Sequence, residues 1–152
     1  MAGAIKPLAD SDPELAMIGI RTGGVSVAQY LHSSLGLSEP LGELNISFYR
    51  DDFSAVGLHP VVGPSSVPFN LDGRHIILVD DVLSTGRTVR AAMNEIFDYG
   101  RPSRITLAVL VERTGHELPI RADVVGLSVD IPEEQHVALQ VDSMTVIIGE
   151  KP

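Results

Sequence analysis

The segment from His75 to Thr88 constrains the fold more than any other part of this chain. Its first half holds four consecutive apolar residues and ends in two aspartates, Asp80 and Asp81. A short apolar run bounded in this way is typical of a strand buried on both faces of a parallel sheet. The second half reads Ser-Thr-Gly-Arg-Thr, and an amphipathic helical pattern follows it. The sequence therefore predicts a strand–loop–helix unit with two carboxylates at the carboxyl end of the strand.

Apolar patterning along the rest of the chain repeats the alternation of strand and helix. Each predicted helix stops at a glycine, Gly36 or Gly100, a residue that commonly ends helices. We expect strands at residues 16–20, 44–48, 75–81, 105–111, 123–125, 137–141 and 145–148, and helices at 27–35 and 89–97. This order predicts a single α/β domain over residues 1–152, with a central, mostly parallel sheet flanked by helices. The last two strands are expected to form an edge or a small flap.

Composition narrows the class of protein. Apolar residues make up 44% and charged residues 20% of 152 residues, which indicates one globular domain and excludes a disordered chain. A net charge of −9 disfavours general binding to nucleic acid or anionic membranes, although it permits a local basic patch. The absence of cysteine excludes thiol catalysis and zinc–thiolate sites. No apolar targeting or spanning segment is present, so we expect a cytoplasmic protein with no membrane partner.

The residues around the two aspartates indicate the chemistry of a ligand. In open α/β sheets, ligands bind beyond the carboxyl ends of the strands. Backbone N–H groups at Thr85–Thr88 would hold a phosphate monoester, whereas Asp80 and Asp81 would repel one. The two carboxylates should instead face hydroxyl groups or a hydrated cation, so the predicted ligand carries a phosphate and a polyol, as ribose 5-phosphate does. Gly86 is followed by Arg87 and not by lysine, which excludes a Walker motif, and no G-x-G-x-x-G occurs.

Ile76–Thr88 resembles the thirteen-residue phosphoribosyl pyrophosphate motif of the type I phosphoribosyltransferases. Further blocks at Tyr49–Asp52, Tyr99–Ser103 and Glu117–Asp123 are similar to the members that combine uracil phosphoribosyltransferase activity with regulation of pyrimidine operons. The resemblance runs from about Met17 to Ile148. It implies a type I phosphoribosyltransferase-like fold with a small hood at about residues 112–135. It also implies a flexible loop at about 50–70 and a short N-terminal extension at 1–15.

The same resemblance assigns roles to individual residues. Asp80 and Asp81 would orient the ribose and hold Mg²⁺ partly through waters, and Arg50 would act from the loop that closes over the substrate. Val82–Thr88 would bind the 5′-phosphate and Thr22–Gly24 the pyrophosphate, while two residues of the hood complete the site. The expected substrate-binding residues are Thr22, Gly23, Gly24, Val82, Leu83, Ser84, Thr85, Gly86, Arg87, Thr88, Arg113 and His116.

The implied reaction converts uracil and phosphoribosyl pyrophosphate to uridine 5′-monophosphate (UMP) and pyrophosphate, with Mg²⁺ as cofactor, in a homo-oligomer. One alternative is an RNA-binding attenuator that senses uridine nucleotides with little or no enzyme activity. Another is a phosphoribosyltransferase for a different base. The hood reads Arg113-Thr114-Gly115-His116-Glu117 where the family usually has Arg-Gly-His-Arg-Glu, and the N-terminal segment is short and acidic. Both departures favour catalysis over binding to the leader RNA of a pyrimidine operon.

Overall fold

The computed structural model describes residues 1–46 and 64–152, in which three helices and seven strands are defined. No helix in these two stretches is long and apolar enough to cross a membrane. In chain order the elements are α1 (Ala2–Ser11), β1 (Ala16–Ile20), α2 (Gly23–Leu35), β2 (Gly42–Leu44), β3 (His75–Leu83), α4 (Arg87–Tyr99), β4 (Arg104–Arg113), β5 (Val124–Val129), β6 (Gln135–Gln140) and β7 (Thr145–Glu150).

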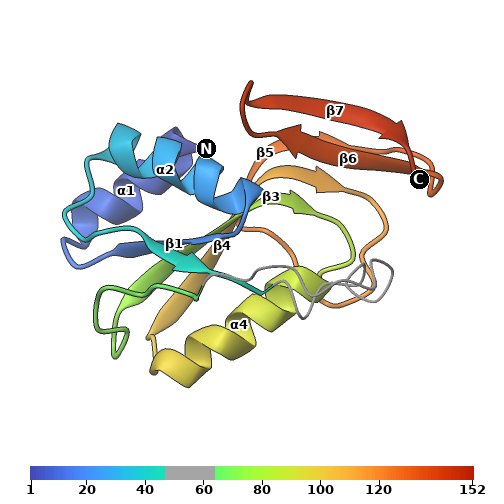
Figure 1. The fold of residues 1–152 in the computed structure, drawn as a ribbon. Coiled ribbons are helices and arrows are strands. Elements are labelled where there is room, and N and C mark those ends of the chain that lie inside the picture. Colours follow the sequence, from blue (N-terminus) through green and yellow to red (C-terminus); the bar gives the residue numbers. More distant parts are fainter. Residues whose placement is uncertain (47–63) are drawn as a thin grey trace.

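Five strands form one sheet in the order β2-β1-β3-β4-β5, and all of its strand pairs are parallel. β6 and β7 form a separate antiparallel pair. Helix α4 covers one face of the sheet, and α1 and α2 cover the other (Figure 1). The predicted α/β class and the parallel sheet are therefore confirmed, and the last two strands form the expected flap.

Strand β3 connects the two halves of the core because its side chains alternate between the two faces of the sheet. Ile76 and Leu78 pack in the cluster beneath α4, whereas Ile77 and Val79 pack in the cluster beneath α1 and α2. All four side chains are fully buried. The run of four apolar residues thus reflects burial on both faces, as the sequence predicts.

The N-terminal segment differs from the expectation. Residues 1–15, predicted as an extension, contain helix α1, with Pro7 inside it. Ile5 is fully buried and packs in the same cluster as Leu31 of α2. The sequence pattern missed this helix because proline is disfavoured in a helix interior, where it cannot donate a backbone hydrogen bond. Burial of one apolar stripe against α2 and the sheet compensates for that loss.

Several strand boundaries also differ from the predicted ones, and the differences at β3 and β2 are the ones nearest the predicted site. β3 continues beyond Asp81 to Leu83, because Val82 and Leu83 pair with Val111 and Glu112 of β4. β2 begins at Gly42 and ends at Leu44, whereas the strand was predicted at 44–48, of which residues 47 and 48 lie outside the described part. Residues 47–63 lie outside the described part, and with them most of the loop predicted at 50–70. The end of that loop is described, where the backbones of Ser66 and Glu43 exchange two hydrogen bonds of 2.7 and 2.8 Å.

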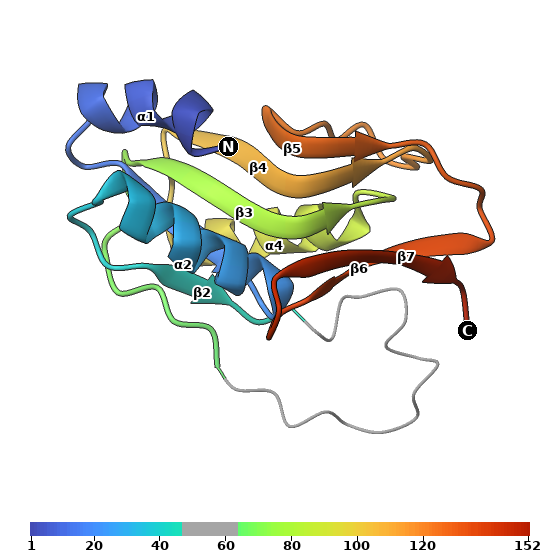
Figure 2. The same ribbon diagram turned by 90° about the horizontal axis from the view of Figure 1, so that it is seen from above.

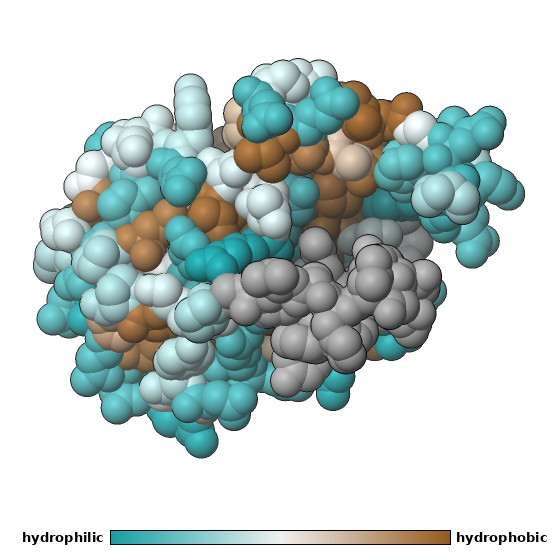
Figure 3. Space-filling view, viewed as in Figure 1, coloured by the Kyte–Doolittle hydropathy of each residue, from teal (hydrophilic) through white to brown (hydrophobic). Residues whose placement is uncertain are grey.

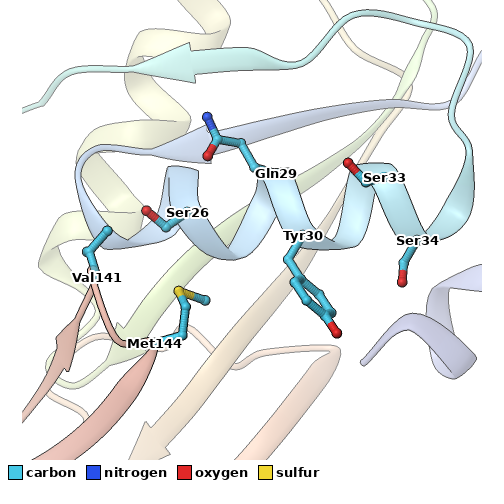
Figure 4. Close-up of a pocket in the computed structure, with 7 residues that line it drawn as sticks. All are labelled: Ser26, Gln29, Tyr30, Ser33, Ser34, Val141 and Met144. Atoms are coloured by element: carbon cyan, nitrogen blue, oxygen red, sulfur yellow. The ribbon is translucent and has the colours of Figure 1, made fainter.

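The β6–β7 hairpin lies beside the N-terminal half of α2, beyond the carboxyl end of β3 (Figures 1 and 2). Leu139 anchors it by packing against the cluster that contains Val79. The hairpin turn and α2 border a groove of about 690 Å³ that Tyr30 and Met144 line (Figure 4). Apolar surface is exposed on the hairpin (Figure 3), where Ile148 is 49% exposed.

Candidate active site

Asp80 and Asp81 lie near the carboxyl edge of the parallel sheet and differ in exposure. Asp80 is 2% exposed, whereas Asp81 is partly open to solvent and lines a cleft. Asp80 Oδ1 accepts a hydrogen bond of 2.9 Å from the backbone N–H of Asp81, and Asp81 Oδ1 accepts one of 3.0 Å from that of Val82. These bonds fix the orientation of both carboxylates, so Asp81 presents a positioned negative charge to the cleft.

The turn between β1 and α2 packs directly against these aspartates. A β-carbon on Gly24 would stand 2.7 Å from the carbonyl oxygen of Val79 and 3.0 Å from the Cα of Asp80. A β-carbon on Gly23 would overlap the carboxylate of Asp81. The peptide bond between Arg21 and Thr22 is cis, and Arg21 is paired with Glu43 of β2. The structure therefore brings the predicted pyrophosphate residues beside the predicted ribose residues.

Residues 84–86 form the turn that leads from β3 into α4. Gly86 precedes the first turn of the helix with a φ of 97°, a left-handed conformation that glycine adopts far more readily than other residues. Within the described residues, neither N-cap residue, Thr22 or Gly86, makes a side-chain capping hydrogen bond, and neither first turn contains an acidic residue. At α4, the hydroxyl oxygen of Thr85 accepts a hydrogen bond of 3.2 Å from the backbone N–H of Arg87. Both N-termini follow strands that end at the same edge of the sheet. The N–H groups of the first turns and the helix dipoles therefore create two adjacent sites that suit anions.

The connection after β4 packs against the turn at residues 84–86, which is expected to bind the phosphate. The carbonyl oxygen of Thr85 accepts hydrogen bonds of 3.0 Å from the backbone N–H groups of both Glu117 and Leu118. Arg87 pairs with the carboxylate of Glu117 at 3.0 Å. A β-carbon on Gly86 would stand 3.3 Å from Cβ of Ile120. The turn that is expected to bind the phosphate is thus held from its outer side by residues 117–120.

A cleft of about 830 Å³ lies between the strand end and the hood. Asp81, Thr85 and Thr88 line it from the strand end, and Ile131, Glu133, residues 136–139 and Lys151 line it from the segment that contains β6. No sequence pattern predicts a role for His136, Glu133 or Lys151, which also line this cleft. Isolated residues on a strand and at a chain end form no local motif, and only the folding of the hairpin over the sheet brings them to this cleft.

The two predicted hood residues lie in different environments. Arg113 is 7% exposed and lines the cleft, but its guanidinium donates hydrogen bonds to backbone carbonyl groups. His116 is partly buried, with its Nε2 3.7 Å from Oε1 of Glu112. Arg50 lies outside the described residues, so its predicted catalytic role remains a prediction.

Four exposed arginines lie at or near the two ends of α4 and could contact RNA phosphates. Arg87 and Arg90 are exposed in the first turn, whereas Arg101 and Arg104 are exposed beyond its last turn. A helix of 13 residues is about 20 Å long, since each residue adds about 1.5 Å. These side chains therefore do not form one compact cluster, although an extended RNA backbone could contact both ends of the helix.

The site also suits a magnesium ion that arrives with its ligand. No group of three or more histidine, aspartate or glutamate side chains that could hold a metal occurs in residues 1–46 and 64–152. Mg²⁺ is commonly held by one or two carboxylates, several waters and substrate phosphates, without a complete protein cage. Asp80 and Asp81 beside two anion-binding helix ends provide this type of donor set.

The fold and the site together define a phosphoribosyltransferase. The phosphoribosyl transferase domain family matches residues 4–143, and the chain belongs to this family. Its curated relatives include the Bifunctional protein PyrR of Nitrosococcus oceani, 64% identical over 126 residues, which cover 82% of this chain and 71% of that protein. Bifunctional protein PyrR of Pseudomonas fluorescens is 57% identical over 129 residues, which cover 85% of this chain and 76% of the relative. The resemblance stated from the sequence is confirmed.

Solved structures with the same fold include a purine phosphoribosyltransferase from Pyrococcus horikoshii. It aligns with a TM-score of 0.63 and 24% identity over 86% of this chain and 80% of that one. A hypoxanthine phosphoribosyltransferase from Staphylococcus aureus aligns with a TM-score of 0.65 and 16% identity, covering 92% and 76% of the two chains. At these identities the likeness concerns the fold alone.

Proposed function

We propose that this protein transfers the phosphoribosyl group of phosphoribosyl pyrophosphate to uracil, which yields UMP and pyrophosphate. The observation that carries the proposal is the position of Asp80 and Asp81 between the N-termini of α2 and α4. A ligand that spans this edge needs an anionic group at each helix end and hydroxyl groups between them. Phosphoribosyl pyrophosphate has that arrangement, with its 5′-phosphate, its ribose and its pyrophosphate.

In the proposed mechanism, this chain contributes positioning and electrostatic stabilisation, and no covalent intermediate is needed. The N–H groups at the start of α4 bind the 5′-phosphate, and those at Thr22–Gly24 bind the pyrophosphate. Asp80 and Asp81 accept hydrogen bonds from the ribose hydroxyls and hold the anomeric carbon in line with the entering base. Positive charge that develops on the ribose as the bond to pyrophosphate breaks is stabilised by the same carboxylates.

We include Mg²⁺ in the proposal, because a pyrophosphate beside two carboxylates needs compensation of its charge. Asp80 and Asp81 would hold the ion, in part through waters. When bound, Mg²⁺ neutralises charge on the leaving pyrophosphate.

The test is release of pyrophosphate by the purified protein with phosphoribosyl pyrophosphate and uracil, compared with cytosine, hypoxanthine and guanine as the base. We expect uracil to give the highest kcat/KM. Double substitution of Asp80 and Asp81 by asparagine should abolish release while the protein remains folded. Faster turnover of another base would contradict the uracil assignment but not the phosphoribosyl transfer.

A second activity is favoured by the bifunctional relatives and by the exposed arginines at or near the two ends of α4. We propose that the protein also binds pyrimidine leader RNA in the cytoplasm, as a homo-oligomer, with uridine nucleotides as the signal. Arg90 and Arg104 would contact phosphates, so the affinity should fall steeply as salt rises. Specific binding to a leader transcript over an unrelated RNA at physiological salt supports this role. Equal binding to both RNAs contradicts it and leaves the enzyme as the only proposed function.

A further inference from the structure

We infer that Arg113 is a positioning residue that holds the hood wall of the cleft in place through backbone carbonyl groups. This inference rests on the proposed function for its effect on uracil, but the structural role itself does not depend on which base is used. The expectation that Arg113 also contacts the substrate stays a prediction.

The geometry around Arg113 is that of a bridge between the end of β4 and the segment before β6. Its Nη1 donates a hydrogen bond of 2.7 Å to the carbonyl oxygen of Gln135, and its Nη2 donates one of 3.3 Å to that of Pro132. Its Nε donates one of 3.3 Å to the carbonyl oxygen of Thr114. All three guanidinium nitrogens are thus engaged by carbonyl groups of the protein. The side chain is directed to the backbone of the hood.

The surrounding bonds show that this contact is the centre of a small network. The carbonyl oxygen of Pro132 also accepts a hydrogen bond of 3.1 Å from the backbone N–H of Gln135, which closes a turn at residues 132–135. Arg113 bonds to the first and last residues of this turn. Thr114 adds a hydrogen bond of 2.9 Å from its hydroxyl to the carboxylate of Asp130. The N–H of Lys151 donates one of 2.8 Å to Glu134 O and fixes the other side of the same turn.

A guanidinium suits this role better than an ammonium group. Its donors lie in a rigid, planar fork, so it can reach two carbonyl groups on separate residues at once. A lysine would keep the positive charge but provide a compact point charge on a flexible chain. Arg113 is 7% exposed, so loss of its bonds would leave carbonyl groups of the hood without partners away from bulk water.

The turn that Arg113 holds leads directly into the wall of the cleft. His136 follows Gln135, and residues 136–139 of β6 line the cleft opposite Asp81 and Thr85. Phosphate and pyrophosphate are expected at the helix ends on the sheet side, so the hood side remains for the base. Arg113 therefore determines how far the base-facing wall stands from the ribose and should influence the affinity for uracil more than that for phosphoribosyl pyrophosphate.

The test compares Arg113→Gln and Arg113→Lys with wild type, and uses Arg121→Gln, an exposed arginine of the same β4–β5 connection, as the matched control. Hydrogen exchange without ligand should show loss of protection in residues 132–139 of both Arg113 variants, while β1 and β3 keep theirs. Loss of hydrogen bonds from a charged donor should raise the KM for uracil by about tenfold or more. The dissociation constant of phosphoribosyl pyrophosphate should stay close to the wild-type value.

Three results would overturn the inference. Unchanged exchange in residues 132–139 would show that the bonds do not hold the turn. Recovery of uracil affinity in Arg113→Lys would show that the affinity depends on a positive charge at position 113 and not on the planar set of donors of the guanidinium. Global unfolding of both variants would show that Arg113 supports the whole domain. If the wild type does not use uracil, the proposed function fails, but the exchange experiment still tests the structural role.

Discussion

Gly23 lies so close to Asp81 that a β-carbon at position 23 would overlap the carboxylate oxygen Oδ2. The first residue of α2 and the partly exposed aspartate of β3 are therefore in direct contact, although 58 positions separate them in the sequence. This contact places an anion-binding helix end against a carboxylate. The site can then bind a ligand that carries both phosphates and hydroxyl groups.

Gly23→Ala should displace the Asp81 carboxylate and impair catalysis with little effect on folding. Misplacement of a catalytic group by about 1 Å can reduce the rate about a hundredfold. We expect a loss of kcat/KM of that order. Gly3→Ala is the matched control, because Gly3 lies in α1 and a β-carbon added there would have nothing within 4 Å. Wild-type kcat/KM in Gly23→Ala would show that Asp81 adjusts freely and has no fixed role.

Gly86→Ala should weaken binding of UMP by more than its effect on stability explains. Gly86 has a φ of 97°, and its β-carbon would also press against Ile120 and Leu118. Gly73→Ala is the control, since Gly73 has a φ of 71° with open space around it. Both variants should lose about 1–2 kcal/mol of stability from the left-handed conformation. Calorimetry with UMP should show weakened binding for Gly86→Ala only, and equal affinities in the two variants would place the phosphate elsewhere.

The bulkier Gly86→Val should abolish binding while the fold largely persists.

Phosphoribosyl pyrophosphate should bind tightly only in the presence of Mg²⁺. Without the ion, Asp80 and Asp81 would repel the pyrophosphate. The described residues contain no group of three or more side chains that could hold a metal before the ligand arrives. Titration calorimetry with Mg²⁺ and with a chelator measures the difference. Replacement of both aspartates by asparagine provides the matched comparison, since it should reduce the dependence on Mg²⁺. Equal affinity of the wild type in both buffers would contradict the role given to the carboxylates.

His75 should make stability depend on pH at the opposite end of β3 from the active site. Burial lowers the pKa of His75, nearby Arg104 lowers it further, and Asp12 and Asp123 oppose the change. The folded state therefore resists protonation, so the unfolded state binds more protons as pH falls below about 6.5. The free energy of unfolding should decrease from pH 7.5 towards pH 5.5.

His75→Gln tests this assignment, because glutamine retains a hydrogen-bonding group near Thr106, whose Oγ1 lies 2.7 Å from Nε2 of His75. Urea unfolding at several pH values should show a shallower decrease for the variant. Parallel curves for the two proteins would mean that other groups cause the dependence.

Sequence patterns were sufficient for the parallel core and for the position of the phosphate turn. Four consecutive apolar residues bounded in this way are typical of a central strand. Asp80 and Asp81 come directly after these residues, and Gly86 lies in the turn that follows the strand. These patterns consist of adjacent residues, so they can be recognised without knowledge of the rest of the fold. The resemblance to phosphoribosyltransferases rests on the same contiguous residues, which is why the family assignment is confirmed.

Tertiary contacts, and not local sequence patterns, determine that helix α1 forms and that β3 extends to Leu83. Pro7 argues against a helix on local grounds, yet burial of Ile5 against α2 stabilises one, because packing of an apolar stripe outweighs a weak propensity. The β3 extension to Leu83 likewise exists because β4 pairs with it.

The sequence by itself therefore determined the class of fold, the family and the strand–turn–helix that bears the two aspartates, since each is encoded by adjacent residues. Only the tertiary structure decided that Gly23 touches Asp81, that Arg113 bonds to the backbone of the hood, and that His136 faces the cleft. These relationships join residues from distant parts of the chain. Their physical basis is the packing of helices and hairpin onto the sheet, which no local pattern contains.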